Sequence, residues 1–168
     1  MDEVSLSLGA MIRFAILLTI AAPAAAGAAP RIVAAAGSWA ALAGPGQCDA
    51  ASLSLLPASK TRLQGRASVT FDGRSRRGQF AAALSKPVAP GGSAMLTIGD
   101  QPFLLVARGT GAWSRGPAQE AAILAAMRGG TRMRIEARTQ RGMRFIDRYD
   151  LTGAPTAIDA AAACALAL

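Results

Sequence analysis

The chain has 168 residues, a formal net charge of +8 and no histidine, and 52% of its residues are hydrophobic. The absence of histidine excludes catalytic triads with an imidazole base and removes the commonest metal ligand. A strongly basic chain is attracted to anionic surfaces, with a strength that depends on salt. Sixteen arginines against two lysines, beside long alanine runs, are also typical of GC-rich coding, so charge alone does not identify a ligand.

The segment MIRFAILLTIAAPAAA, residues 11–26, has the pattern of a secretory signal peptide. Its apolar run from Phe14 to Ala22 is as long as a signal-peptide core and shorter than the roughly 20 residues that span a bilayer. Arg13 precedes this run, and Ala24-Ala25-Ala26 supplies a small-residue cleavage site. The chain is therefore expected to be exported.

We predict a signal peptide over residues 1–26 and one mature domain over residues 27–168, a common size for a single core. The acidic residues at the start are unusual in a signal peptide, so Met11 is an alternative initiator. Cleavage would leave no transmembrane anchor. The mature domain is expected to be periplasmic or secreted.

Cys48 and Cys164 are the only cysteines. An even number of cysteines in an exported chain favours a disulfide between them. A redox-active thiol would need a C-x-x-C pair or a basic environment, and the sequence shows neither. We therefore predict a structural disulfide that ties the two ends of the domain together.

Between Gly37 and Ala107, short apolar or alternating runs are separated by turn residues, which is typical of antiparallel strands. Asp72-Gly73 and Gly99-Asp100 are the natural turn points, and Lys86 to Gly92 is a loop. The expected strands lie around Trp39 and over residues 67–71, 79–84, 94–98 and 102–107.

Residues 118–128, AQEAAILAAMR, are predicted to form a helix that begins after Gly116-Pro117 and stops at Gly129-Gly130. Alanine and leucine favour helix. Glu120 near its start and Arg128 near its end both suit the helix dipole. This helix is expected to pack on the sheet.

Residues 132–138 alternate between arginine or glutamate and apolar side chains, which predicts a half-buried strand. A turn over residues 139–142 and a returning strand over 143–151 complete a hairpin. Asp147 interrupts the apolar face of the second strand and Ile146 interrupts its polar face. A bulge or an edge position would explain both.

Thr156, three residues before Asp159, predicts a capping box that starts an alanine-rich C-terminal helix. The whole pattern predicts a mainly β fold of the α+β kind. We expect an antiparallel β-sandwich or a partly open barrel, with one inserted helix and one C-terminal helix.

The order of basic strand, glycine turn, D-x-Y-x-L-x-G and alanine helix, roughly within residues 37–164, resembles the invasion-associated locus B family. The most specific positions are Asp147, Tyr149, Leu151 and Gly153. The resemblance implies a small exported bacterial protein with a β-rich fold, in a family linked to host-cell invasion in some pathogens and without an established activity. It implies no catalytic residues. This chain departs from the family by its few cysteines and by Pro155.

The sequence offers no recognisable catalytic, metal-binding or cofactor-binding set. A serine nucleophile needs a base, and Lys60 and Lys86 form no S-x-x-K motif. The run around Ser93 lacks the second glycine of a nucleophile elbow, and Gly109-Thr110-Gly111 lacks the third glycine of a dinucleotide loop. We therefore predict no catalytic residue, no metal site and no cofactor.

Paired carboxylates could still act as acid and base, as in glycosidases. Asp147 with Asp150 or Glu136 is the nearest candidate pair, so a periplasmic hydrolase is an alternative function. Salt bridges to neighbouring arginines of the same two strands are the simpler explanation of these carboxylates.

The best candidate for ligand binding is a basic stripe across the hairpin, although a solvated polar face would have the same pattern. We expect an unknown protein or an anionic envelope component as partner, and a purely structural envelope role is a further alternative. Few aromatics are present and Trp113 lies in a separate segment, so specific nucleic-acid binding is not expected. The stripe consists of Arg132, Arg134, Arg138, Arg144 and Arg148.

Overall fold

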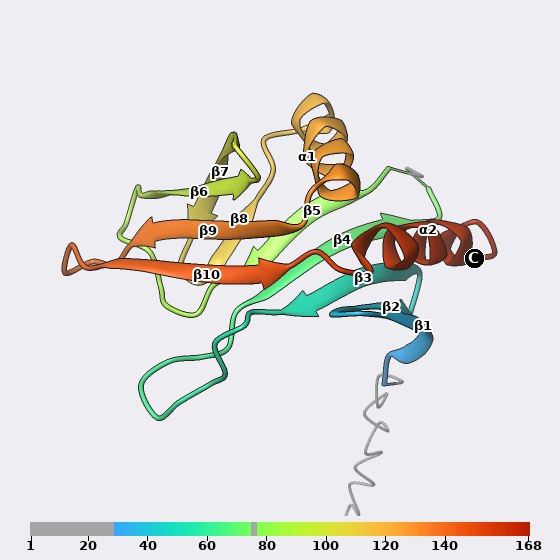
Figure 1. The fold of residues 1–168 in the computed structure, drawn as a ribbon, viewed down its shortest axis with the longest axis horizontal. Helices are drawn as coiled ribbons and strands as arrows, with labels where there is room; N and C mark the ends of the chain where they lie inside the picture. The colour runs from blue at the N-terminus through green and yellow to red at the C-terminus, as the bar shows by residue number, and fades with distance from the viewer. Residues whose placement is uncertain (1–28, 75–76) are drawn as a thin grey trace, which may run out of the picture.

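The computed structural model describes residues 29–74 and 77–168, and the predicted signal peptide and its cleavage site lie outside these ranges. The described residues form ten strands and two helices (Figure 1). The elements are β1 (Arg31–Ala36), β2 (Trp39–Gly44), β3 (Gln47–Leu53), β4 (Arg66–Asp72), β5 (Gln79–Ala83), β6 (Ser93–Ile98), β7 (Gln101–Arg108), β8 (Gly111–Trp113), α1 (Pro117–Gly129), β9 (Arg132–Arg138), β10 (Arg144–Asp150) and α2 (Ala154–Ala165).

All ten strands belong to one antiparallel sheet in the order β1-β2-β3-β4-β5-β8-β7-β6-β9-β10. The sheet is not closed by strand pairing, but its ends are joined by single hydrogen bonds. The backbone N–H of Ser38 donates to the carbonyl oxygen of Thr152 at 3.0 Å, and the indole N–H of Trp39 donates to that of Asp150 at 2.8 Å. The mainly β fold with an inserted and a C-terminal helix is thus confirmed, as one sheet whose ends meet.

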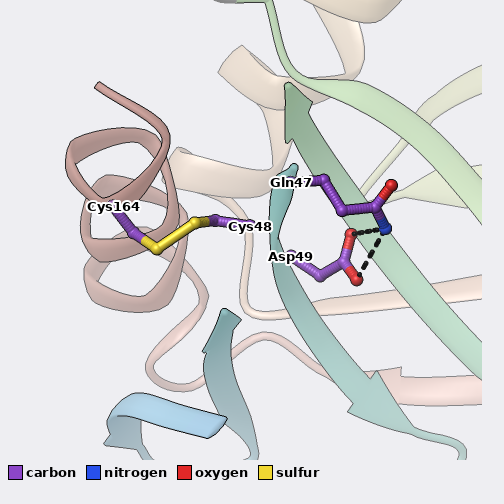
Figure 2. The surroundings of a disulfide bond; sticks show 4 residues. All are labelled: Gln47, Cys48, Asp49 and Cys164. Carbon is purple, nitrogen blue, oxygen red and sulfur yellow. Dashed lines mark hydrogen bonds between the residues drawn. A yellow bond between two sulfur atoms is a disulfide. The ribbon is translucent and has the colours of Figure 1, made fainter. Parts of the chain in front are cut away.

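Both helices cover the same face of the sheet, which we call the inner face. Helix α1 buries Ile123 and Met127 and packs on β5, β6 and β7, whereas α2 packs on β1 to β4. Cys48 on β3 is bonded to Cys164 on α2, so the disulfide fixes the second helix to the sheet. Figure 2 shows this bond on one side of β3. In residues 29–74 and 77–168, no helix covers the opposite, outer face.

Two N-terminal strands and the last helix differ from the sequence prediction. Strands β1 and β3 were not predicted because their sequences, RIVAAA and QCDAASL, are rich in alanine, which favours helix. Small side chains suit β3, because three consecutive residues there, Ala50 to Ser52, are buried.

The predicted capping box of the last helix is wrong. Helix α2 begins at Ala154, its N-cap is Gly153 in the left-handed region (φ 86°), and no side chain caps it. Pro155 lies in the first turn, where the missing N–H costs nothing. The chain therefore turns sharply at Gly153, directly after β10, and Thr156 has no capping role.

Candidate functional site

The five arginines predicted to form a basic stripe all lie exposed on the outer face of β9 and β10. The two strands pair without interruption from Arg138 opposite Arg144 to Arg132 opposite Asp150. The bulge that the sequence left open is therefore absent. Alternation along both strands places the arginines outward and Met133, Ile135 and Phe145 inward.

Two of the five arginines are engaged by other groups of the hairpin. The guanidinium of Arg144 donates two hydrogen bonds to the Glu136 carboxylate, one of them at 2.6 Å. This pair lowers the pKa of Glu136 and raises the pKa of Arg144. Arg138 donates to the carbonyl oxygen of Gly142 at 3.0 Å and so holds the β-turn. Both side chains have a structural partner.

The other three arginines, Arg132, Arg134 and Arg148, line a depression of about 500 Å³. Thr97 extends this site onto β6, and Asp100 also lines it. Asp150, opposite Arg132, has a lowered pKa because Thr152 donates a backbone and a hydroxyl hydrogen bond to it, with a smaller contribution from Arg132. The Asp150 carboxylate is therefore ionised at neutral pH.

Arg134 and Arg148 lie directly opposite each other on the paired strands. Like charges in this arrangement destabilise a sheet. In residues 29–74 and 77–168, no carboxylate forms an ion pair with either guanidinium. A guanidinium has a planar set of N–H donors that matches phosphate or carboxylate oxygens. An anion bound between these arginines would satisfy those donors and offset the repulsion.

The paired-carboxylate hypothesis is wrong in its geometry. Asp147 lies on the inner face, is only 2% exposed, and accepts a hydrogen bond from the backbone N–H of Ser85 at 2.8 Å. Glu136 and Asp150 lie on the outer face, on the other side of the backbone. The prediction of a salt bridge holds for Glu136 and is wrong for Asp147. These three carboxylates do not share a site.

The residues that carry the family resemblance have structural roles. Asp147 anchors the loop after β5 through Ser85, and Tyr149 and Leu151 are buried in the core. Burial raises the pKa of Tyr149, whose hydroxyl has no hydrogen-bond partner among the described residues. A Cβ on Gly153 would lie 1.8 Å from the carbonyl oxygen of Ala36. The motif therefore builds the core and joins the sheet ends.

The remaining sequence candidates have simple structural explanations. Gly109 and Thr110 form the turn between β7 and β8, with Gly109 at φ 57°, and they form no phosphate loop. Ser93 is the exposed first residue of β6. Trp113 lies on the outer face of β8, where it pairs with Val106 on β7.

Sequence analysis missed an apolar patch on the outer face, next to the stripe. Leu104 faces Met95 across β6 and β7, and Trp113 faces Val106 across β7 and β8. These four side chains are between 37% and 41% exposed. The alternation in SAMLTI and PFLLVA could have indicated outward apolar side chains, but their contact depends on strand order.

No group of His, Cys, Asp or Glu side chains that could hold a metal ion occurs in the described part of the chain. Among the same residues, no helix is long and apolar enough to cross a membrane. No family model matches the chain, and comparison with curated proteins and with solved structures also finds no significant match.

Proposed function

We propose that this chain is an exported, non-catalytic envelope protein that binds the phosphate or carboxylate groups of an anionic partner. The binding surface is the site around Arg132, Arg134 and Arg148 on the outer face. This role agrees with the resemblance to the invasion-associated locus B family, and we propose membership of that family on the same motif.

The observation that carries the proposal is the directly opposed pair Arg134 and Arg148, neither of which forms an ion pair with a carboxylate of the described residues. A merely solvated face could place its charges anywhere, and directly opposed like charges cost stability. On the same hairpin, Arg144 forms an ion pair with Glu136. An arginine of this face can therefore be neutralised by a carboxylate of the protein itself. Two guanidinium groups that lie beside a depression without an ion-pair partner in the described residues favour an external anion.

Export is supported by two independent features. Residues 11–26 have the signal-peptide pattern, and the structure contains a disulfide between Cys48 and Cys164. Disulfides persist in the periplasm and outside the cell and are rare in reducing compartments. The anions of the bacterial envelope are therefore the ones that this protein would meet.

Chromatography on immobilised heparin, a soluble polyanion, tests the proposal. The double variant R134Q/R148Q should elute at clearly lower salt than the wild type. The control R31Q/R115Q removes the same charge from exposed arginines elsewhere and should elute close to the wild type. Equal shifts for both variants would show that binding follows net charge alone, and the proposed site would be abandoned.

A further inference from the structure

The connection between β3 and β4, residues 54–65, exposes three leucines, and we call it the leucine loop. Leu55, Leu56 and Leu63 are 59%, 48% and 63% exposed. In Figure 1 the loop extends away from the sheet, beyond the edge of β10. Exposed apolar clusters of this kind on a small domain mark sites of interaction with proteins or membranes.

The leucine loop is held by hydrogen bonds along its length. The backbone N–H of Ser54 donates to the carbonyl oxygen of Gly65 at 2.7 Å, and that of Ser59 donates to the carbonyl oxygen of Arg62 at 2.8 Å. The side chain of Gln64 donates to the carbonyl oxygen of Ser54 at 2.8 Å. The leucines are therefore displayed on an ordered scaffold, which lowers the entropy cost of binding.

The leucine loop is also next to the arginine site. The backbone N–H of Leu55 donates to the carbonyl oxygen of Arg148 at 2.8 Å, which fixes the base of the loop along β10. Leu55 lines the same depression as Arg134 and Arg148. Leu55 of the leucine loop and the arginines thus form one continuous surface.

The charge of the leucine loop matches this neighbour. Its sequence, SLLPASKTRLQG, contains Lys60 and Arg62 and no acidic residue. Protruding apolar side chains flanked by cations are the combination that binds anionic bilayers, because acyl chains bury the former and lipid phosphates attract the latter. An acidic protein would match these charges equally well but would also have to offer an apolar pocket for the exposed leucines, which a bilayer provides without a specific fit.

We propose that the partner is an anionic phospholipid bilayer, into which the leucine loop inserts while Arg132, Arg134 and Arg148 contact the lipid phosphates. The proposal rests on the anion-binding function above and names its partner. The two contributions differ in their dependence on salt. Phosphate contacts weaken as salt rises, whereas burial of leucine does not.

Co-sedimentation with vesicles of phosphatidylglycerol and phosphatidylcholine in equal parts tests this inference. The variant L56S/L63S should bind these vesicles at least about tenfold more weakly than the wild type. On binding, the two leucines of the wild type move from water into the acyl chains, and serine gains nothing from this transfer. The control is L166S, which changes a leucine with a similar exposed fraction, 67%, at the end of α2. It should bind like the wild type.

Insertion itself is measured with a tryptophan at position 56, in the variant L56W/W113F. Its fluorescence should be quenched by lipids brominated along the acyl chains. The other native tryptophan, Trp39, is buried and serves as the unquenched background.

The outcomes separate this inference from the proposed function. Normal vesicle binding by L56S/L63S, or absence of quenching at position 56, would overturn insertion while leaving the arginine site intact. Heparin binding that depends on Arg134 and Arg148, without any vesicle binding, would have the same meaning. A leucine-dependent change from dimer to monomer without vesicle binding would assign the loop to a second copy and overturn the inference. If R134Q/R148Q elutes from heparin like its control R31Q/R115Q, and L56S/L63S binds vesicles like its control L166S, both proposals are overturned.

Discussion

The inner and outer faces of the sheet differ in the environment of their side chains. On the inner face, side chains are buried under α1 and α2 and have their position fixed by packing, as for Tyr149 and Leu151. On the outer face, side chains meet solvent, and the arginines, the apolar patch and the leucine loop are adjacent there. Asp147 and Arg148 are neighbours in sequence, yet the first is 2% exposed and the second is exposed.

The motif that carries the family resemblance and the surface proposed to bind a partner are therefore separate sets of residues. Asp147, Tyr149, Leu151 and Gly153 build the fold from the inner side and from the turn after β10. Their presence therefore informs about architecture. Evidence for binding has to come from the outer face, and substitutions on the two faces should have different consequences.

The largest effect is expected for G153A. Gly153 has φ 86°, and an added Cβ would meet the backbone of Ala36 at 1.8 Å, so the turn after β10 would have to separate from the β1–β2 turn. Strain and overpacking together should cost about 2–6 kcal/mol. Urea unfolding measures the loss. G142A, at another positive φ with open space around it, should cost clearly less.

The disulfide is expected to have the next largest effect. The bond joins residues 116 positions apart, so its removal in C48S/C164S should lower the free energy of unfolding by about 2–4 kcal/mol, mainly through the unfolded chain. Thermal unfolding of this variant, compared with the oxidised wild type, gives the value. Heparin binding measured well below the melting temperature should be unchanged, because the arginine site lies on other strands. Its loss there would contradict the separation of the two faces.

A smaller effect on the inner face is expected at Asp147. D147A leaves the buried N–H of Ser85 without its acceptor and should cost about 1–3 kcal/mol. D147N keeps an amide oxygen at the same place and should be milder. Hydrogen exchange of the Ser85 amide provides the direct readout, since it should accelerate in D147A only. Exchange in D147A as slow as in the wild type would show that the carboxylate does not hold this loop.

On the outer face, a substitution is expected to raise the free energy of unfolding instead of lowering it. R134Q removes one of two directly opposed cations and should stabilise the protein by about 0.2–1 kcal/mol, while it weakens heparin binding. R31Q on β1, where Arg31 faces Ala43, should leave stability unchanged. A destabilised R134Q would mean that Arg134 has a structural partner, and the argument for an external anion would fail.

The smallest effect concerns the pH dependence of the hairpin. The Arg144 guanidinium holds the pKa of Glu136 below its ordinary value of 4.5, so this pair stabilises the fold above that pH and loses its contribution as pH falls through the lowered pKa. In R144Q the pKa of Glu136 should rise toward 4.5. An NMR titration of the Glu136 carboxyl carbon measures it. An unchanged pKa would show that Arg134 and Arg138 dominate instead.

Local patterns in the sequence were sufficient for the inserted helix, for the β9–β10 hairpin and for the outward direction of its five arginines. Each depends on residues close together in the chain, through a period of two or through helix propensity. The two cysteines could form only one internal pair, so counting sufficed there. Alanine-rich β1 and β3 escaped prediction because β1 is a strand through its pairing with β2, and β3 through its burial beneath α2.

Tertiary structure alone decided which polar residues are buried and which cations are left unpaired. Asp147 meets Ser85 across 62 residues, Gly153 meets Ala36 from the opposite end of the chain, and the leucine loop meets Arg148 along β10. The sequence determined the inserted helix, the β9–β10 hairpin and the side on which its arginines project, because these follow from backbone geometry within a few residues. Contacts between distant segments depend on the order in which the strands pair, and that order is set by the packing of the whole chain.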